Sequence, residues 1–106
     1  MLTGKNALIT GSTSGIGLGI AEYFAKNGAN IILNGMGDTA EIETTRARLE
    51  RDFAVKVRFH GADMSQTKEI ESMFSSVDAE FGGVDILVNN AGIQFVAPVD
   101  EFPAAK

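Results

Sequence analysis

The stretch Thr10-Gly11-Ser12-Thr13-Ser14-Gly15-Ile16-Gly17 decides the fold that we predict for this chain. It follows an apolar run at residues 7–9, typical of a buried strand, and precedes residues 18–26, whose pattern predicts a helix. In order, its three glycines permit a tight turn, a close approach of backbone to a bound group, and packing of the helix on the strand. The free N–H groups of the first helical turn favour an anion such as a pyrophosphate.

The spacing of these glycines is G-x-x-x-G-x-G, which differs from the commoner G-x-G-x-x-G. Glycines also mark ordinary turns, so a turn without a ligand is the alternative. The strand before, the helix after and a second apolar strand at residues 30–33 supply the context of a dinucleotide-binding turn. We therefore predict dinucleotide binding at this segment.

The composition is that of one small globular domain: 106 residues, of which 44% are hydrophobic and 22% charged. A net charge of −5 without a basic cluster argues against nucleic acids and anionic membranes as partners. The chain has no cysteine, which excludes disulfides and thiolate metal sites, and we predict no other metal site. We see no signal peptide or membrane-spanning run, and we expect a cytoplasmic protein.

Apolar runs alternate with helical patterns along the chain, which predicts an α/β fold. The strands are expected at residues 6–10, 29–34, 55–59 and 84–89, and the helices at 15–27, 38–52 and 66–81. Right-handed crossovers then give a doubly wound parallel sheet in the order third, second, first, fourth, with helices on both faces. We expect Ile16, Ile20, Phe24 and Ala21 on the inner face of the first helix, and Ser65 as the cap of the third.

The chain reverses direction between the first and fourth strands, and ligands bind in the crevice at such a switch point. Four stretches at strand ends converge there: residues 11–17, 34–38, 63–64 and 89–92. Asp63 could accept a hydrogen bond from an adenine amino group, with the Met64 N–H donating to the ring. The alternative role for Asp63 is that of a turn residue.

The end of the second strand normally discriminates between NAD and NADP. It carries Asn34 and, slightly late, Asp38, which with Glu41 also matches a capping box of the next helix. No Lys or Arg lies in this stretch or in residues 12–16 to neutralise a 2′-phosphate. We therefore predict NAD as the cofactor.

Together these residues resemble the short-chain dehydrogenase/reductase family, through the Thr10–Gly17 motif, Asp63 and Asn89-Asn90-Ala91-Gly92, in that order. The resemblance covers the whole chain. It implies a Rossmann fold, a small hydroxy acid as substrate and a homo-oligomer, a tetramer, for the intact enzyme. It also implies that Gln94 helps to hold the substrate carboxylate, and that the cofactor contacts come from Gly11, Thr13, Ser14, Gly15, Ile16, Gly17, Met36, Asp63, Met64, Asn90, Ala91 and Gly92.

Within that family, residues 12–21, 33–38, 61–65 and 89–98 resemble the group of 3-hydroxybutyrate dehydrogenases. The resemblance implies oxidation of 3-hydroxybutyrate to acetoacetate by hydride transfer to NAD. Two alternatives stay open. One is a nucleotide-binding or partner-binding module without catalysis, and the other is the cofactor half of an enzyme like a 3-oxoacyl carrier-protein reductase.

The family's catalytic groups are a Ser, a Tyr-x-x-x-Lys pair and an assisting Asn, in the second half of a longer chain. Here Tyr23 is the only tyrosine, and Asn27 stands where the Lys would be. We therefore expect residues 1–106 to be the N-terminal half of a dinucleotide-binding domain, without a second domain, without catalytic residues and inactive alone. We also expect one edge of the fourth strand to be open, because the second half of the domain would normally pair with it.

Overall fold

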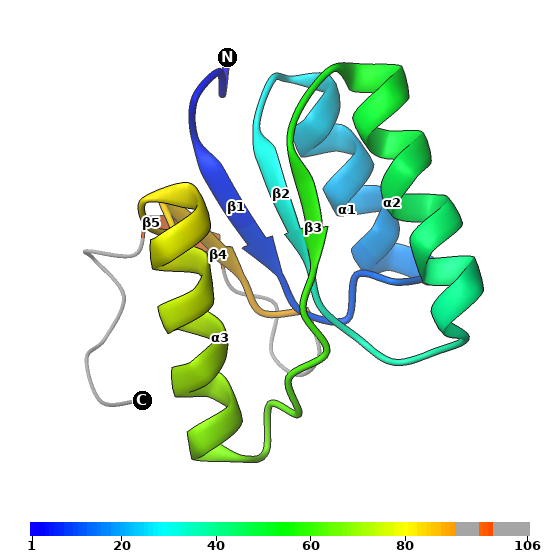
Figure 1. Cartoon of the computed structure of the whole chain (residues 1–106). Helices are drawn as coiled ribbons and strands as arrows, with labels where there is room; N and C mark the ends of the chain where they lie inside the picture. Colours follow the sequence, from blue (N-terminus) through cyan, green and yellow to red (C-terminus); the bar gives the residue numbers. More distant parts are fainter. Residues whose placement is uncertain (91–95, 99–106) are drawn as a thin grey trace.

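The fold is a five-stranded sheet with helices on both faces (Figure 1). The computed structural model describes residues 1–90 and, in backbone only, residues 96–98. The strands are β1 (Asn6–Ile9), β2 (Asn30–Leu33), β3 (Val57–Phe59), β4 (Ile86–Val88) and β5 (Val96–Pro98), in the spatial order β3-β2-β1-β4-β5. The predicted order of the first four strands is confirmed, and all three pairings among them are parallel.

Three helices connect the parallel strands: α1 (Gly15–Lys26), α2 (Thr39–Phe53) and α3 (Thr67–Phe81). Figure 1 shows α1 and α2 on one face of the sheet and α3 on the other, as a doubly wound connection requires. Within the residues that the structure describes, no helix is both long and apolar enough to cross a membrane.

The core lies on both faces of the sheet, because successive side chains of a strand point to opposite sides. Each central strand is apolar at nearly every position, which is typical of parallel strands covered on both faces. The face under α1 and α2 buries Ala7, Ile9, Ala21, Ala25, Ala29, Ile31, Leu33, Leu49, Val57 and Val88. The face under α3 buries Leu8, Ile32, Ala62, Met73, Val77 and Leu87.

The inner face of α1 differs in part from the predicted one. Its fully buried positions are the small residues Gly17, Ala21 and Ala25, while Ile20 and Phe24 pack at the margin of the core. Ile16 is 73% exposed, so its expected place in the core was wrong. The spacing of apolar residues located the helix correctly, but close packing on the sheet selects side chains by size and rotates the buried stripe toward the smallest ones.

The edge of β4 is not open, which corrects the expectation for this strand. β5 pairs with it in antiparallel register, with Leu87 opposite Ala97 and Ile86 opposite Pro98. An unpaired strand edge presents free N–H and C=O groups, and a segment that returns beside it satisfies them. Pro98 has no N–H to donate, which suits a strand at the edge of a sheet. Three residues are too few to show a period, and this is why the sequence pattern did not reveal β5.

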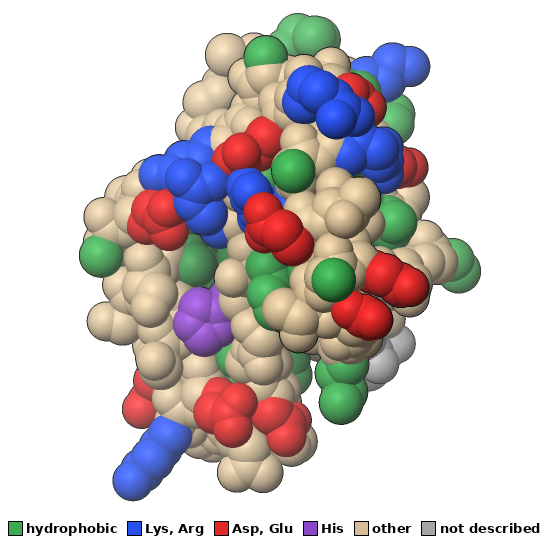
Figure 2. All heavy atoms as spheres, turned by 45° about the vertical axis from the view of Figure 1, so that its right-hand side comes forward, with side chains coloured by type: hydrophobic (Ala, Val, Ile, Leu, Met, Phe, Trp, Pro, Cys, Tyr) green, Lys and Arg blue, Asp and Glu red, His purple; other side chains and the backbone are tan. Residues whose placement is uncertain are grey.

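The opposite edge of the sheet, at β3, is closed by charged side chains. The Val57 N–H donates to Glu50 Oε2 at 2.9 Å, and the Val57 carbonyl accepts from Arg46 Nη1 at 3.1 Å. Arg58 donates to Glu50 of α2 at 2.6 Å and to Glu80 of α3 at 2.7 Å. These bonds join helices on opposite faces across the edge, where Figure 2 shows basic and acidic side chains interleaved.

Glu50 is the centre of this network, and its pKa lies below the ordinary glutamate value of 4.5. The main cause is the hydrogen bond from the Val57 backbone, followed by those from Arg46 and Arg58. A carboxyl whose pKa is lowered by folding stabilises the folded state above its ordinary pKa. That stabilisation is lost as the pH falls through the lowered value.

We predict that Glu50→Gln lowers the free energy of unfolding by about 1 kcal/mol at neutral pH, because the amide keeps an acceptor for Val57 but loses both ion pairs. The difference from the wild type should shrink as the pH falls below 4.5 and through the lowered pKa of Glu50. Urea unfolding followed by circular dichroism at several pH values measures it. Glu71→Gln on α3 is the matched control, since Glu71 makes no ion pair within the described residues. An equal loss at both pH extremes would contradict the prediction.

Candidate functional site

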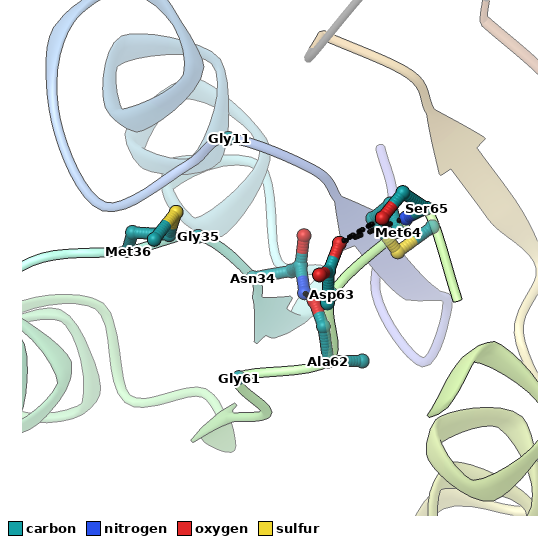
Figure 3. A pocket seen from close by; sticks show the side chains of 9 residues that line it. All are labelled: Gly11, Asn34, Gly35, Met36, Gly61, Ala62, Asp63, Met64 and Ser65. Carbon is teal, nitrogen blue, oxygen red and sulfur yellow. Dashed lines mark hydrogen bonds between the residues drawn. The ribbon is translucent and has the colours of Figure 1, made fainter. Parts of the chain in front are cut away.

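The carboxyl ends of β1, β2 and β3 meet at one hollow of about 420 Å³. Figure 3 shows this pocket from close by, with Asn34 and Asp63 between Met36 and Met64. The residues that line it come from three loops of the parallel sheet: Gly11, Asn34, Gly35, Met36, Gly61, Ala62, Asp63, Met64 and Ser65. The predicted convergence of these strand ends is therefore confirmed for the first three strands.

The turn after β1 is tied to the end of β2 by backbone and hydroxyl hydrogen bonds. Gly11 adopts a positive φ of 61°, a conformation that glycine reaches at little cost. The Ser12 N–H donates to the Asn34 carbonyl at 2.7 Å, and the buried Ser12 hydroxyl bonds Ile9 O at 2.6 Å. This turn consequently has one fixed shape at the mouth of the pocket.

The first turn of α1 faces outward. Its N-cap, Ser14, makes no capping hydrogen bond with its side chain, and Gly15 and Ile16 are exposed. A Cβ added to Gly15 would meet nothing within 4 Å. Because the first N–H groups of a helix lack partners within the helix, this end of α1 presents donors to an anion.

Gly17 is buried and sets how closely α1 approaches the turn. A Cβ at this position would stand 2.0 Å from the Gly11 carbonyl oxygen and 2.7 Å from Asn90 Nδ2. Asn90 itself donates from Nδ2 to that same carbonyl at 3.2 Å, and its N–H donates to Thr10 Oγ1 at 2.9 Å. The end of β4 is thereby joined to the turn after β1.

Asn34 is a polar residue at the end of an otherwise apolar strand, and it is buried. Its Nδ2 donates to the carbonyls of His60 and Ala62, both at 3.0 Å, and its N–H donates to Ser12 Oγ at 3.0 Å. Asn34 thus joins the loops after β1, β2 and β3 at the floor of the pocket, through its backbone N–H to the first and through its side chain to the third. We did not predict this role, although a polar residue at the end of an apolar strand was the available signal.

Asp63 lies at the rim of the pocket and remains exposed. Its Oδ1 accepts from the Ser65 N–H at 2.9 Å and from the Ser65 hydroxyl at 2.7 Å. These two bonds, the backbone one first, lower the pKa of Asp63 below the ordinary value of 3.8. Asp63 is therefore an ionised acceptor at neutral pH. Ser65 thus donates hydrogen bonds to Asp63. The N-cap of α3 is Gln66, so the expected capping role of Ser65 was wrong.

Met36 separates this pocket from a second hollow of about 270 Å³ at the start of α2. The Thr13 hydroxyl donates to the Met36 carbonyl at 2.8 Å, and a Cβ on Gly35 would stand 2.7 Å from that hydroxyl oxygen. The Met36 side chain is 91% exposed. The second hollow is lined by Thr13, Ser14, Met36, Gly37, Asp38, Glu41, Ile42 and Thr45.

Asp38 is confirmed as the N-cap of α2, since its Oδ1 accepts from the N–H groups of Ala40 at 2.8 Å and Glu41 at 3.4 Å. The two hollows together are lined by three carboxylates, those of Asp38, Glu41 and Asp63, and by no Lys or Arg. The site therefore combines outward-facing helix N–H groups with a rim that carries negative charge.

The family follows from a comparison of this chain with known proteins. A model of the short chain dehydrogenase family matches residues 5–106. The chain belongs to the short-chain dehydrogenase family. The Rossmann-like sheet agrees with the fold that the resemblance implied.

Two curated relatives are similar over nearly the whole chain. It is 55% identical over 106 residues to the D-beta-hydroxybutyrate dehydrogenase of Cupriavidus necator, and 52% identical over 102 residues to that of Rhizobium meliloti. The matches cover 100% and 96% of this chain but only 40% of each relative. The chain thus spans about 40% of the length of these dehydrogenases.

Solved structures of other short-chain dehydrogenases have the same arrangement. The L-sorbose reductase of Gluconobacter frateurii, complexed with NADPH and L-sorbose, superposes with a TM-score of 0.79 at 40% identity. A short-chain dehydrogenase/reductase of Sinorhizobium meliloti gives 0.79 at 37% identity. The alignments cover 97% and 90% of this chain and 39% and 43% of those structures. Members of this family use a nicotinamide cofactor and act on small molecules.

The structure brings together most of the residues predicted for cofactor binding. Gly11, Met36, Asp63 and Met64 line the first hollow, and Thr13, Ser14 and again Met36 line the second. Gly15 and Ile16 lie at the start of α1, whereas Gly17 and Asn90 lie behind the turn. Ala91, Gly92 and Gln94 fall outside the described residues. The prediction omitted five residues that line the first hollow: Asn34, Gly35, Gly61, Ala62 and Ser65.

We predict that Gly17→Ala lowers the free energy of unfolding by about 1–3 kcal/mol, because its methyl group forces α1 away from the Gly11 carbonyl. Gly19→Ala, half a turn further along α1, is the matched control. A Cβ there meets nothing within 4 Å, so this exposed alanine should stabilise the helix by about 0.5–1 kcal/mol. Urea midpoints with unchanged slopes measure both effects. A shift of the same sign and size for both variants would disprove the packing role of Gly17.

Proposed function

We propose that residues 1–106 form the cofactor-binding half of a dinucleotide-binding domain in an NAD-dependent oxidoreductase that converts 3-hydroxybutyrate to acetoacetate. The observation that carries the proposal is the hollow at the carboxyl ends of three parallel strands, beside the outward-facing start of α1. Ligands of open α/β sheets bind at this place. The bound dinucleotide would supply the chemistry by accepting a hydride from the substrate.

The residues fit the two ends of an adenosine diphosphate group. The exposed N-terminal turn of α1, with Gly15 and Ile16, would donate to the pyrophosphate, and the absence of a side chain on Gly15 leaves room for it. In the first hollow, the ionised Asp63 would accept from the adenine amino group, with the Met64 N–H donating to the ring. The exposed side chain of Met36 would contact the adenosine.

The rim charges favour NAD over NADP. A 2′-phosphate would enter a site whose lining residues include Asp38 and Glu41 and no cation. Two N–H groups at the start of α2, those of Ala40 and Glu41, already donate to the Asp38 carboxylate, so they are not free to bind a phosphate. Electrostatic repulsion and the occupation of these two N–H groups both act against the extra phosphate.

The proposed substrate rests on identities of 55% and 52% to hydroxybutyrate dehydrogenases. Gln94 would help to hold the substrate carboxylate, and Asn90, Ala91 and Gly92 would lie along the nicotinamide side of the cofactor. Tyr23, the only tyrosine, is exposed on α1, and α1 lies on the opposite face of the sheet from α3. We assign it no catalytic role, and residues 1–106 alone would bind without turnover.

We predict that Asp63→Asn weakens NAD binding about tenfold, because one carboxylate acceptor becomes an amide donor that faces the adenine amino group. Nicotinamide hypoxanthine dinucleotide has a carbonyl oxygen in place of that amino group. The variant should therefore bind this analogue more tightly than the wild type does. Isothermal titration calorimetry measures both ligands on both proteins, and Asp78→Asn on α3 controls for the loss of charge. An equal loss for both ligands would contradict the assigned contact.

We predict that the chain binds NAD at least about tenfold more tightly than NADP. The 2′-phosphate of NADP would lack roughly one charged hydrogen bond, and the carboxylates of the rim would repel it. With NAD and 3-hydroxybutyrate it should produce no NADH, because no described residue is placed as a general acid or base beside the nicotinamide. Calorimetry and NADH absorbance measure the two parts separately. Equal affinities would refute the preference for NAD, and NADH formation would refute the inactivity of this half.

A further inference from the structure

The sulfur atoms of this chain are unevenly placed with respect to the site. The chain has no cysteine and four methionines, so its only oxidisable sulfur atoms are thioethers. Two of the four, Met36 and Met64, line the first hollow, on opposite sides of Asn34 and Asp63 in Figure 3. Met73 is fully buried in the core under α3, and Met1 lies exposed at the start of the chain.

Met36 combines full access with a place in the site. Its side chain is 91% exposed, nearly as much as that of Met1 at 94%, and it lines both hollows. The glycines on either side, Gly35 and Gly37, offer no side chain that could cover it. Its backbone is nevertheless held in place, because the Thr13 hydroxyl donates to the Met36 carbonyl at 2.8 Å. An oxidant therefore reaches this sulfur freely, while the residue stays at the mouth of the site.

We propose that Met36 is a site of reversible oxidation and that its sulfoxide weakens dinucleotide binding. This inference rests on the proposed function, in which the Met36 side chain contacts the adenosine. In the reaction, a peroxide transfers one oxygen atom to the sulfur lone pair. The thioether is oxidised by two electrons to the sulfoxide, and hydrogen peroxide is reduced to water.

The effect on binding follows from the polarity of the product. A thioether is apolar and adapts its shape to a flat ring, whereas a sulfoxide is polar and accepts hydrogen bonds. Water satisfies the sulfoxide oxygen while the site is open. A bound adenosine would displace that water. The charged side chains that line the two hollows, Asp38, Glu41 and Asp63, are acceptors and cannot replace it, and the hydroxyls of Thr13 and Ser65 already donate to Met36 O and to Asp63. The sulfoxide should therefore lower the affinity for NAD about tenfold.

The test exposes the chain to dilute hydrogen peroxide with and without NAD and follows each methionine by peptide mass spectrometry. Met1 and Met73 are internal controls for an exposed and a buried thioether. We expect Met36 to oxidise at a rate close to that of Met1 and much faster than Met73. NAD should protect Met36 but not Met1, and treatment with methionine sulfoxide reductases should restore NAD affinity.

The variant Met36→Leu separates this residue from Met64. Its NAD affinity is measured before and after peroxide treatment, and the treatment should not lower that affinity, because leucine has no sulfur to oxidise. Loss of affinity in this variant would assign the effect to Met64 and overturn the proposal. Unchanged affinity of the oxidised wild type would also overturn it while leaving the proposed function intact. Failure of the untreated chain to bind NAD would overturn both.

Discussion

The close approach of α1 to the turn after β1 is the contact on which the site depends. No side chain fits between Gly17 and the Gly11 carbonyl, and Asn90 donates to that carbonyl from the end of β4. This arrangement fixes where the first turn of α1 points. Since the free N–H groups of a helix lie at its first turn, the same contact decides where an anion is attracted. A small error in packing here would displace the donors from the hollow.

Buried polar groups hold the rest of the site in shape. Asn34 and Ser12 link three loops through hydrogen bonds that are shielded from water, so each bond is costly to lose. Loops normally vary in conformation, but each of these three loops follows a parallel strand that is packed in the core. The rigidity of the floor contrasts with the exposure of the Met36 side chain at the mouth of the hollow.

Charge is divided between two regions of the molecule. Arginine side chains are tied to glutamates at the β3 edge, where they close the sheet and join α2 to α3. The rim of the site has carboxylates and no lysine or arginine among its lining residues. The arginines at the β3 edge therefore have a structural role. In the function that we propose, phosphate binding is left to the helix N–H groups, and the rim charges disfavour an additional phosphate.

The sequence by itself determined the family, the strand order of the parallel sheet and the loops that meet at the site. Glycine spacing and apolar periodicity report local backbone requirements, and those requirements fix the topology once crossovers are right-handed. Only the tertiary structure decided which side chains those loops present. It exposed Ile16 and buried Gly17 and Ala25 in its place, paired β5 with β4, and gave Asn34 its linking role. These features depend on contacts between segments far apart in the chain, and size, register and hydrogen-bond partners across such distances leave no periodic signal in the sequence.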